Sequence, residues 1–460
     1  MAIIVINNWT VKSNQLSRYK GIIIWGSIMT KVNDELKLSL TGDSFIATRM
    51  SIYKEPEFLS LIEIIRKAHV RFTNLEVLIN DFKGYPAAQS GGTYAATESY
   101  IADELKWMGF NIVSRANNHA MDYKVEGMIE TTRNLDRVGI VHAGVGMNLG
   151  EARSPAYLET SWGRVALISA ASTFPTEARA GASRPDLQGR PGVNPLRYSV
   201  TYTIPKEAFE VIIKIAKLRG YKPKEKIDTI RLFGNKFVKG EEVKIEFKVN
   251  KLDEEGNLKA IKDAKKMADF VIFSLHCHER YLSLEKPAPF IEEFARKCID
   301  AGADLFVGHG PHVLRGIEIY KGKPIFYSLG NFIFQNDLIK KQPADLYERY
   351  KLDWNATPSE LYDTREKGIP DLIKMGFKWF TEKPEYWETI LVHCTFNEGR
   401  FEEIKLYPVD LGFEKTRPNR GRPLLAKGEK ALKILKNIKK LSKPYGTKIK
   451  IEENIGRIKM

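Results

Sequence analysis

Carboxylate, amide and imidazole side chains recur in this sequence at the points where apolar runs end. The stretch "SRANNHAMDY" (114–123) places two asparagines, a histidine and an aspartate directly after the apolar run "FNIV" (110–113). A single polar residue in such a position usually caps a helix or forms a turn. Several of them predict a shared site, because the carboxyl ends of strands in an α/β sheet converge on one crevice. The side chains placed in this way are Asp43, Glu76, Asn118, His119, His276, His309 and His312.

The chemistry that this set favours is binding of one or two divalent metal ions. Oxygen and imidazole ligands in this ratio suit Mn²⁺, Fe²⁺ or Zn²⁺, and the lack of clustered cysteines argues against a structural zinc site. Two such ions about 4 Å apart can share a carboxylate and activate a water molecule. Asn118 would then offer a neutral oxygen ligand, and His119 would stand beside the metals to protonate a leaving group. Cys277 and His278 flank His276, and either one could line the pocket.

The elements that must position these residues are apolar strands alternating with amphipathic helices. Near-continuous apolar strands indicate an α/β sheet that is covered on both faces. We expect strands at 35–40, 70–75, 110–116, 164–172, 269–275 and 303–308, helices at 56–69, 99–109, 124–139, 288–302 and 429–441, and a hairpin at 388–409.

Two segments interrupt this alternation within a main domain expected at 31–410. Residues 198–266 look like a small α+β insertion, and residues 337–387 form a second one that is rich in tyrosine and tryptophan. The aromatic residues of the second insertion could line a substrate groove, form an oligomer contact or pack a peripheral subdomain. Residues 1–30 read as an N-terminal extension, whose apolar run 20–29 is too short to span a bilayer, and residues 411–460 as a basic C-terminal segment.

The formal net charge of +15 raises the question of an anionic partner. The basic excess lies mostly in residues 206–266, with 17 Lys/Arg against 11 Asp/Glu, and in residues 427–460, with 11 against 3. Nucleic acid is disfavoured as a partner, because its binding groove would concentrate basic and aromatic residues around the reactive centre. The basic C-terminal segment could contact an anionic membrane. Three widely spaced cysteines suit a reducing compartment and favour the cytoplasm.

The motifs in their order resemble those of CapA-type proteins, which are associated with poly-γ-glutamate capsule biosynthesis and belong to the calcineurin-like metallophosphoesterase superfamily. The resemblance covers most of residues 38–335. Its motifs are "GDSFIATR" (42–49), "NLE" (74–76), "ANNHAMDY" (116–123), "SLHCHERY" (274–281), "GADLFVGHGPHV" (302–313) and "GKPIFYSLGNF" (322–332). It implies a four-layer α/β/β/α sandwich, with a second sheet built from strands such as 316–319, 325–329 and 388–409. Since members of this family are often anchored outside the cell, it also leaves an extracellular or membrane-associated location open.

The resemblance also implies roles for the polar residues. His119 would be the proton donor, and the metal ligands would be Asp43, Glu76, Asn118, His276, His309 and His312. Three departures from the motifs of the superfamily imply that one metal position binds its ion weakly or stays empty. The superfamily usually opens with Asp-x-His, where this chain has Asp43-Ser44-Phe45; its closing Gly-His-x-His is lengthened by one residue here; and the Trp-Gly that often follows the histidine matching His276 is Cys277-His278.

Three functions are consistent with these observations. The first is a metal-dependent hydrolase or transferase acting on an anionic amide polymer such as poly-γ-glutamate. Arg49, Arg190 and Arg197 are then candidate carboxylate clamps, since arginine binds carboxylates bidentately, although surface or packing roles suit them equally well. The second is a metal-dependent phosphoesterase using the same residues. The third, suggested by the missing first-motif histidine, is a non-catalytic polymer-binding protein with a degenerate metal site.

Overall fold

The computed structural model describes residues 35–460, apart from residues 225 and 369–382, together with two short paired strands, β1 (Ile4–Ile6) and β2 (Trp9–Val11). Most of the N-terminal extension expected at 1–30 therefore lies outside the described residues. Among the described residues, no helix combines the length and the apolar character needed to cross a membrane.

A ten-stranded mixed sheet forms one half of the main domain. Its parallel part holds β3 (Glu35–Phe45), β4 (Val70–Leu75), β7 (Ile112–Ser114) and β8 (Val141–Ala143). Antiparallel strands continue the sheet on the other side of β3, in the order β24 (Glu388–Asn397), β25 (Arg400–Asp410), β28 (Ile455–Lys459) and β27 (Lys450–Glu452). Two further strands complete it: β23 (Asn331–Phe334) pairs with β3, and β26 (Leu424–Leu425) pairs with β25.

A six-stranded sheet forms the other half. Its order is β10 (Ala156–Glu159), β11 (Arg164–Ala171), β17 (Phe270–His276), β20 (Leu305–His309), β22 (Lys323–Leu329) and β21 (Leu314–Tyr320). The four central strands, β11, β17, β20 and β22, are parallel, so their carboxyl ends lie at the same edge. β17 and β20 are buried along their whole length, which explains why they read as continuous apolar runs.

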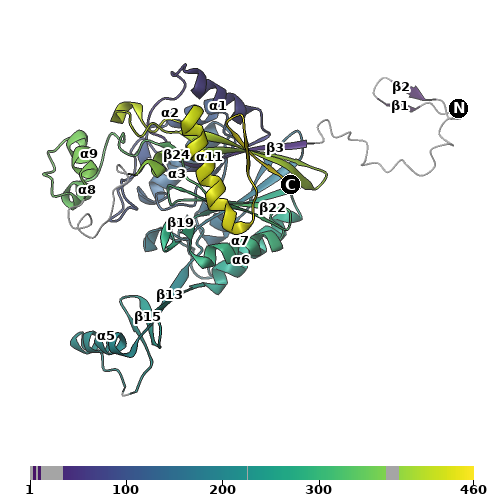
Figure 1. The fold of residues 1–460 in the computed structure, drawn as a ribbon. Helices are drawn as coiled ribbons and strands as arrows, with labels where there is room; N and C mark the ends of the chain where they lie inside the picture. The colour runs from purple at the N-terminus through teal and green to yellow at the C-terminus, as the bar shows by residue number, and fades with distance from the viewer. Residues whose placement is uncertain (1–3, 7–8, 12–34, 225, 369–382) are drawn as a thin grey trace.

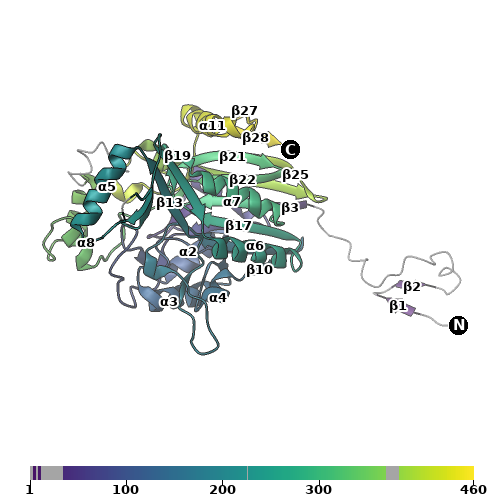
Figure 2. The same ribbon diagram turned by 90° about the horizontal axis from the view of Figure 1, so that it is seen from below.

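The two sheets pack face to face, with helices on both outer faces (Figures 1 and 2). One apolar cluster joins their inner faces, with Leu38 and Phe72 from the larger sheet and Phe270 and Val307 from the smaller. The helices α1 (Pro56–Arg66), α2 (Tyr100–Met108) and α3 (Lys124–Arg137) cover the larger sheet, and α6 (Lys251–Lys265) and α7 (Pro289–Asp300) cover the smaller. The expected α/β/β/α sandwich is confirmed. Its shorter connecting elements are β5 (Leu78–Ile79), β6 (Ala96–Thr97), β9 (Val145–Gly146), α4 (Leu149–Arg153), β12 (Gly192–Val193), β18 (Arg280–Tyr281) and β19 (Ser283–Pro287).

The division of strands between the sheets differs from the expectation in one respect. We expected strands at 316–319, 325–329 and 388–409 to share a second sheet. Instead β21 and β22 extend the sheet of β17 and β20, whereas the 388–409 hairpin pairs with β3. The chain crosses between the sheets at 329–331, because Gly330 accepts a hydrogen bond from the Asp43 backbone N–H and Asn331 starts a strand beside β3.

The first insertion forms a separate small lobe (Figure 1). It contains a four-stranded sheet with the order β14 (Thr229–Leu232), β15 (Asn235–Lys239), β13 (Tyr198–Ile204) and β16 (Lys244–Val249), and the helix α5 (Lys206–Leu218). The lobe is shorter than the expected 198–266, because Ile261 and Ala264 of α6 pack into the cluster that covers the six-stranded sheet.

The second insertion contains two described helices, α8 (Ala344–Arg349) and α9 (Pro358–Glu366). Tyr347 and Tyr362 are buried, and Tyr347 packs with Tyr94 and Tyr123 of the main domain. Trp354 is 78% exposed, and Trp379 lies outside the described residues. For these two buried tyrosines, packing of a peripheral subdomain is the role that the structure shows.

The basic C-terminal segment is part of the sandwich. Helix α11 (Gly428–Ser442) buries Ile434, Leu435 and Ile438 in the core between the sheets, packing across β21 and β25. Strands β27 and β28 then lengthen the ten-stranded sheet. The sequence expectation of a basic segment separate from the domain is therefore wrong, because the apolar face of α11 closes one edge of the sandwich while its lysines face outward.

Candidate metal centre

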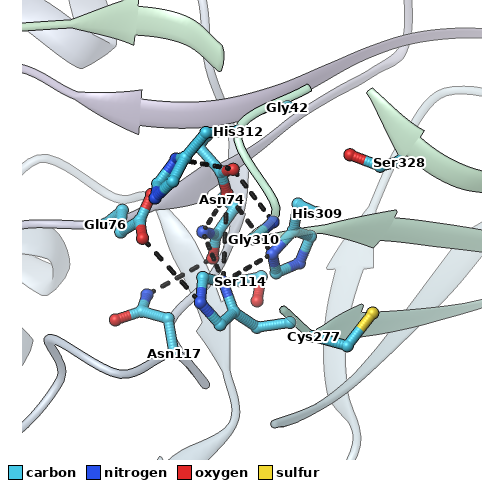
Figure 3. Close-up of polar contacts among 12 residues, drawn as sticks. Gly42, Asn74, Glu76, Ser114, Asn117, Cys277, His309, Gly310, His312 and Ser328 are labelled. Atoms are coloured by element: carbon cyan, nitrogen blue, oxygen red, sulfur yellow. Dashed lines mark hydrogen bonds and ion pairs between the residues drawn. The ribbon is translucent and has the colours of Figure 1, made fainter. Parts of the chain in front are cut away.

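Five of the predicted site residues meet between the two sheets. Asp43 lies near the end of β3, Glu76 follows β4 directly, and His276 and His309 end neighbouring strands in register with each other. All four side chains are 0% exposed. His312 follows in the loop after β20, with a side chain that is 20% exposed. Figure 3 shows Glu76, His309 and His312 directed toward a common centre.

Asp43 is the residue around which three imidazoles gather. Its Oδ1 lies 3.5 Å from His309 Nδ1 and 3.9 Å from His276 Nδ1, and its Oδ2 lies 3.7 Å from His312 Nδ1. Glu76 Oε1 lies 3.8 Å from His276 Nε2, and its Oε2 lies 3.9 Å from His312 Nδ1. These separations are too long for hydrogen bonds and suit donors that converge on an ion. The convergence that the sequence predicted for these five side chains is present.

Backbone and amide donors fix the orientation of Asp43. Asn74 Nδ2 donates to Asp43 Oδ1 at 2.8 Å, and the Gly310 backbone N–H donates to Oδ2 at 2.9 Å. Gly310 has a φ of 111°, a conformation that glycine adopts without strain. A Cβ at this position would also lie 2.9 Å from the Cys277 backbone nitrogen, which explains why position 310 is a glycine. Asn117 in turn donates to the side chain of Asn74 at 3.3 Å, so a chain of amides extends outward from the aspartate.

Unpartnered buried oxygens show that this cluster fits a cation. Both carboxylate oxygens of Glu76 and the side-chain oxygen of Asn118 are buried without a hydrogen-bond partner. Leaving such groups unsatisfied is costly, and a divalent ion would satisfy them. The described residues include three overlapping groups in which the ligand atoms lie within 4.8 Å of one another. The groups are Asp43, His276 and His309; Glu76, His276 and His278; and Asp43, Glu76 and His312.

Burial sets the protonation of the cluster. It raises the pKa of Asp43 to about 7 and the pKa of Glu76 well above its ordinary value, with the neighbouring Asp43 charge adding to the shift of Glu76. It lowers the pKa of His309 to about 3 and that of His312 to about 4, so both imidazoles are neutral at pH 7. Neutral imidazoles are ready to bind a metal, whereas the carboxyl groups must first lose protons.

We therefore expect metal binding to strengthen as the pH rises. Below about pH 7 an ion must displace the proton of Asp43, so affinity for Mn²⁺ should fall about tenfold per pH unit for each proton displaced. The raised pKa of Asp43 also means that its contribution to metal-free stability is present below its ordinary pKa and is lost as the pH rises through 7. The increase in melting temperature on adding Mn²⁺ should consequently be larger at pH 8 than at pH 6. Equal increases at both pH values would contradict this.

His119 stands next to the cluster with a carboxylate behind it. Its Nδ1 is 2.7 Å from Asp122 Oδ2, which also accepts a hydrogen bond from the Ala95 backbone N–H at 2.7 Å. A carboxylate only accepts, so Nδ1 carries a hydrogen and Nε2 remains for exchange with a substrate. Phe45, at the position where the expected Asp-x-His motif has histidine, packs edge-on against the His119 ring with centroids 5.6 Å apart.

Asn118 lies under a glycine loop. A methyl group added at Gly91 would fall 2.0 Å from Asn118 Nδ2 and 2.9 Å from its Cγ, whereas the same addition at Gly92 would meet nothing within 4 Å. We expect Gly91→Ala to displace the Asn118 side chain and weaken metal binding by about tenfold or more, as loss of ligand-orienting contacts does. Gly92→Ala is the matched control and should bind metal like the unmodified protein. Equal affinities of both variants, measured by calorimetry, would argue against Asn118 as a ligand.

The three candidate arginine clamps have partners elsewhere. Arg49 pairs with Glu104 at 3.2 Å and stacks over Tyr100. Arg197 pairs with the buried Asp253 at 2.6 Å, and Arg190 donates to the Arg179 carbonyl at 2.8 Å. Arg190 and Arg197 both lie near Arg179, whereas Arg49 packs against α2. A substrate-binding role for the three arginines stays a prediction.

Three participating residues were not assigned roles from the sequence. Asn74 and Asp122 orient Asp43 and His119, and they lie inside the motifs "NLE" and "ANNHAMDY". His278 Nε2 is 3.0 Å from His276 Nε2. Since side chains alternate along an extended chain, position 278 faces the same way as position 276, and that periodicity could have separated His278 from Cys277.

The two facing sheets, with a polar cluster at their strand ends, define a four-layer α/β/β/α sandwich with a candidate metal site between its halves. The chain belongs to the family described as "Bacterial capsule synthesis protein PGA_cap", whose model matches residues 37–336.

Relatives match two thirds or more of the chain. "Uncharacterized protein y4sH" of Sinorhizobium fredii is 40% identical over 442 residues, which are 95% of this chain and 96% of its own. "Capsule biosynthesis protein CapA" of Bacillus anthracis is 28% identical over 67% of this chain and 57% of its own, and "PGA biosynthesis protein CapA" of Bacillus subtilis is 27% identical over 72% and 71%. Among solved structures, the NAD nucleotidase of Haemophilus influenzae aligns over 88% of this chain and 63% of its own with 10% identity and a TM-score of 0.31, too low to carry an argument.

Proposed function

We propose that this protein is a divalent-metal-dependent hydrolase or transferase that acts on the amide bonds of an anionic γ-glutamyl polymer during capsule biosynthesis. Its family and the names of its Bacillus relatives support the polymer. The observation that carries the chemistry is the buried Glu76. Neither of its oxygens has a hydrogen-bond partner, and the imidazoles of His276, His278 and His312 lie nearby.

The ligand residues in this proposal are Asp43, Glu76, Asn118, His276, His309 and His312, holding one or two ions such as Mn²⁺, Fe²⁺ or Zn²⁺. Such ions supply Lewis-acid polarisation of a carbonyl or phosphoryl oxygen and a water nucleophile at neutral pH. The protein contributes buried side chains held by fixed donors: Asn74 and Gly310 hold Asp43, and Ser274 contacts His309 Nε2 at 2.7 Å.

His119 is the proton donor to the leaving group in this proposal. Its Nδ1–H is held by Asp122, which fixes the ring orientation. Amide cleavage releases an amine, a poor leaving group that departs only when it is protonated, so a positioned imidazole is needed.

The test is an assay of the metal-loaded protein on γ-linked glutamyl oligomers, with α-linked glutamyl oligomers of equal length as the matched control. We expect new amino groups from the γ-linked substrate only, with activity abolished by a chelator and restored by Mn²⁺ or Zn²⁺. Absence of turnover with every metal tested, by a protein shown to hold metal, would refute the catalytic proposal.

A phosphoesterase is the second candidate. The fold class and the His119–Asp122 pair favour it, since the same imidazole would protonate a departing alkoxide. A chromogenic phosphodiester screen with added Mn²⁺ separates it from the first candidate. Binding of the γ-glutamyl polymer that resists chelator, without turnover of either substrate, would instead support the non-catalytic role suggested by Phe45.

A further inference from the structure

His278 stands in the cluster without belonging to the predicted ligand set. Cys277 lies on the opposite side of the strand end, buried in the apolar layer under α7, and Figure 3 shows its sulfur turned away from the polar centre. His278 points back toward the centre, with Nε2 3.0 Å from His276 Nε2 and its ring 5.3 Å from that of His312.

We propose that His278 is a ligand of the second divalent cation, which it holds together with Glu76 and His276. This inference rests on the cation-binding part of the proposed function and is independent of which bond the protein cleaves.

The two faces of His276 explain why a further imidazole is needed. Its Nδ1 faces Asp43 and His309, while its Nε2 faces Glu76 and His278. A neutral imidazole offers one lone pair, because its other nitrogen carries hydrogen. His276 can therefore serve one ion as a neutral ligand. Asp43, His309 and His312 remain for an ion on the first side, and His278 supplies the imidazole that accompanies Glu76 on the second.

Glu76 gives independent support for an ion on that side. It is 0% exposed, and neither of its oxygens has a hydrogen-bond partner. The ligand atoms of Glu76, His276 and His278 all lie within 4.8 Å of one another. Phe45 cannot contribute a ligand from β3, so in this chain the missing donor is replaced from the end of β17.

Arg315 is the positioning residue for His278. It is 0% exposed and donates to the carbonyls of Glu279 at 2.9 Å, Leu284 at 3.0 Å and His278 at 3.4 Å. Thr173 Oγ1 accepts from the His278 backbone N–H at 2.9 Å. The loop that carries His278 is thereby held from both sides. In an Arg315→Lys variant, the single ammonium group of lysine cannot replace the planar guanidinium that reaches three carbonyls.

The experiment counts ions. The full-length protein is dialysed against Mn²⁺, metal is quantified by mass spectrometry, and paired ions are detected from spin coupling in electron paramagnetic resonance. We expect two ions per chain in the unmodified protein, and one ion without spin coupling in His278→Ala. His142→Ala, which removes an imidazole paired with Asp136 at 3.3 Å outside the cluster, is the control and should keep two. His278→Leu, which has a similar volume and offers no ligand atom, serves if the alanine variant does not fold.

Arg315→Lys should lower the affinity for the second ion by about 10-fold and leave the affinity for the first ion unchanged. This loss is in the range found for groups that orient metal ligands. Equal weakening of both ions would reduce Arg315 to a structural role. Two ions of unchanged affinity in His278→Ala, or a single ion in the unmodified protein, would overturn the assignment of His278. Failure to cleave γ-glutamyl oligomers by a protein holding two ions would refute the proposed reaction and leave this site intact.

Discussion

Replacement of Asp43 by asparagine is expected to reduce divalent-metal affinity by at least about 100-fold, because even groups that only orient metal ligands cost 10–100-fold when they are mutated. Asp43 belongs to two of the three ligand groups and faces three imidazoles. Asparagine has nearly the same volume but carries no charge to offset that of a cation. Calorimetric titration with Mn²⁺ at pH 8 measures the effect.

The same variant should fold normally. Ionised Asp43 is disfavoured in the metal-free protein, since burial raises its pKa to about 7. The asparagine removes that charge. Its amide has one oxygen, so it can accept a hydrogen bond from only one of the two donors, Asn74 and Gly310, and the lost hydrogen bond costs about 1 kcal/mol of stability. The metal-free melting temperature should thus change by only a few degrees. Asp136→Asn, at a surface position, is the control for metal affinity. Unchanged Mn²⁺ binding by Asp43→Asn would remove Asp43 from the ligand set.

Replacement of His119 by alanine should lower turnover by about 10²–10⁴-fold, the usual contribution of a positioned acid or base, while metal content stays constant. The reason is geometric: His119 is held by Asp122 beside the ligands and is in none of the three ligand groups. Turnover is measured on whichever substrate the metal-loaded protein cleaves, with metal content measured on the same sample.

Asp122→Asn should give a smaller loss than His119→Ala, because it removes the orientation and the charge behind the imidazole and leaves the ring in place. His142→Ala is the control and should keep full activity. Parallel loss of metal and turnover in His119→Ala would show that His119 is a ligand, contrary to its proposed role.

The positions of the chemical residues could be predicted from the sequence because they depend on local rules. Asp43, Glu76, His276 and His309 each lie at or next to the carboxyl end of an apolar strand. Such strand ends meet in an α/β fold whether one sheet or two contribute them. The site thus formed as expected although β3 and β4 belong to one sheet and β17 and β20 to the other.

The features that could not be predicted depend on long-range packing. The lysine-rich helix α11 has the pattern of any surface helix, and its sequence does not say that its apolar face closes the gap between β21 and β25. The same holds for the arginines. Arg197 meets Asp253 across 56 residues, and only the folded chain shows that its charge is already paired.

The most direct test of the central claim is a crystal structure of the Mn²⁺-loaded protein with anomalous scattering recorded at the manganese edge. We expect anomalous peaks within coordination distance of Asp43, Glu76, His276 and His309, with His119 close by and not coordinated. Mn²⁺ bound only elsewhere on the surface, or an empty cluster at saturating Mn²⁺ and pH 8, would contradict the assignment of these side chains as metal ligands.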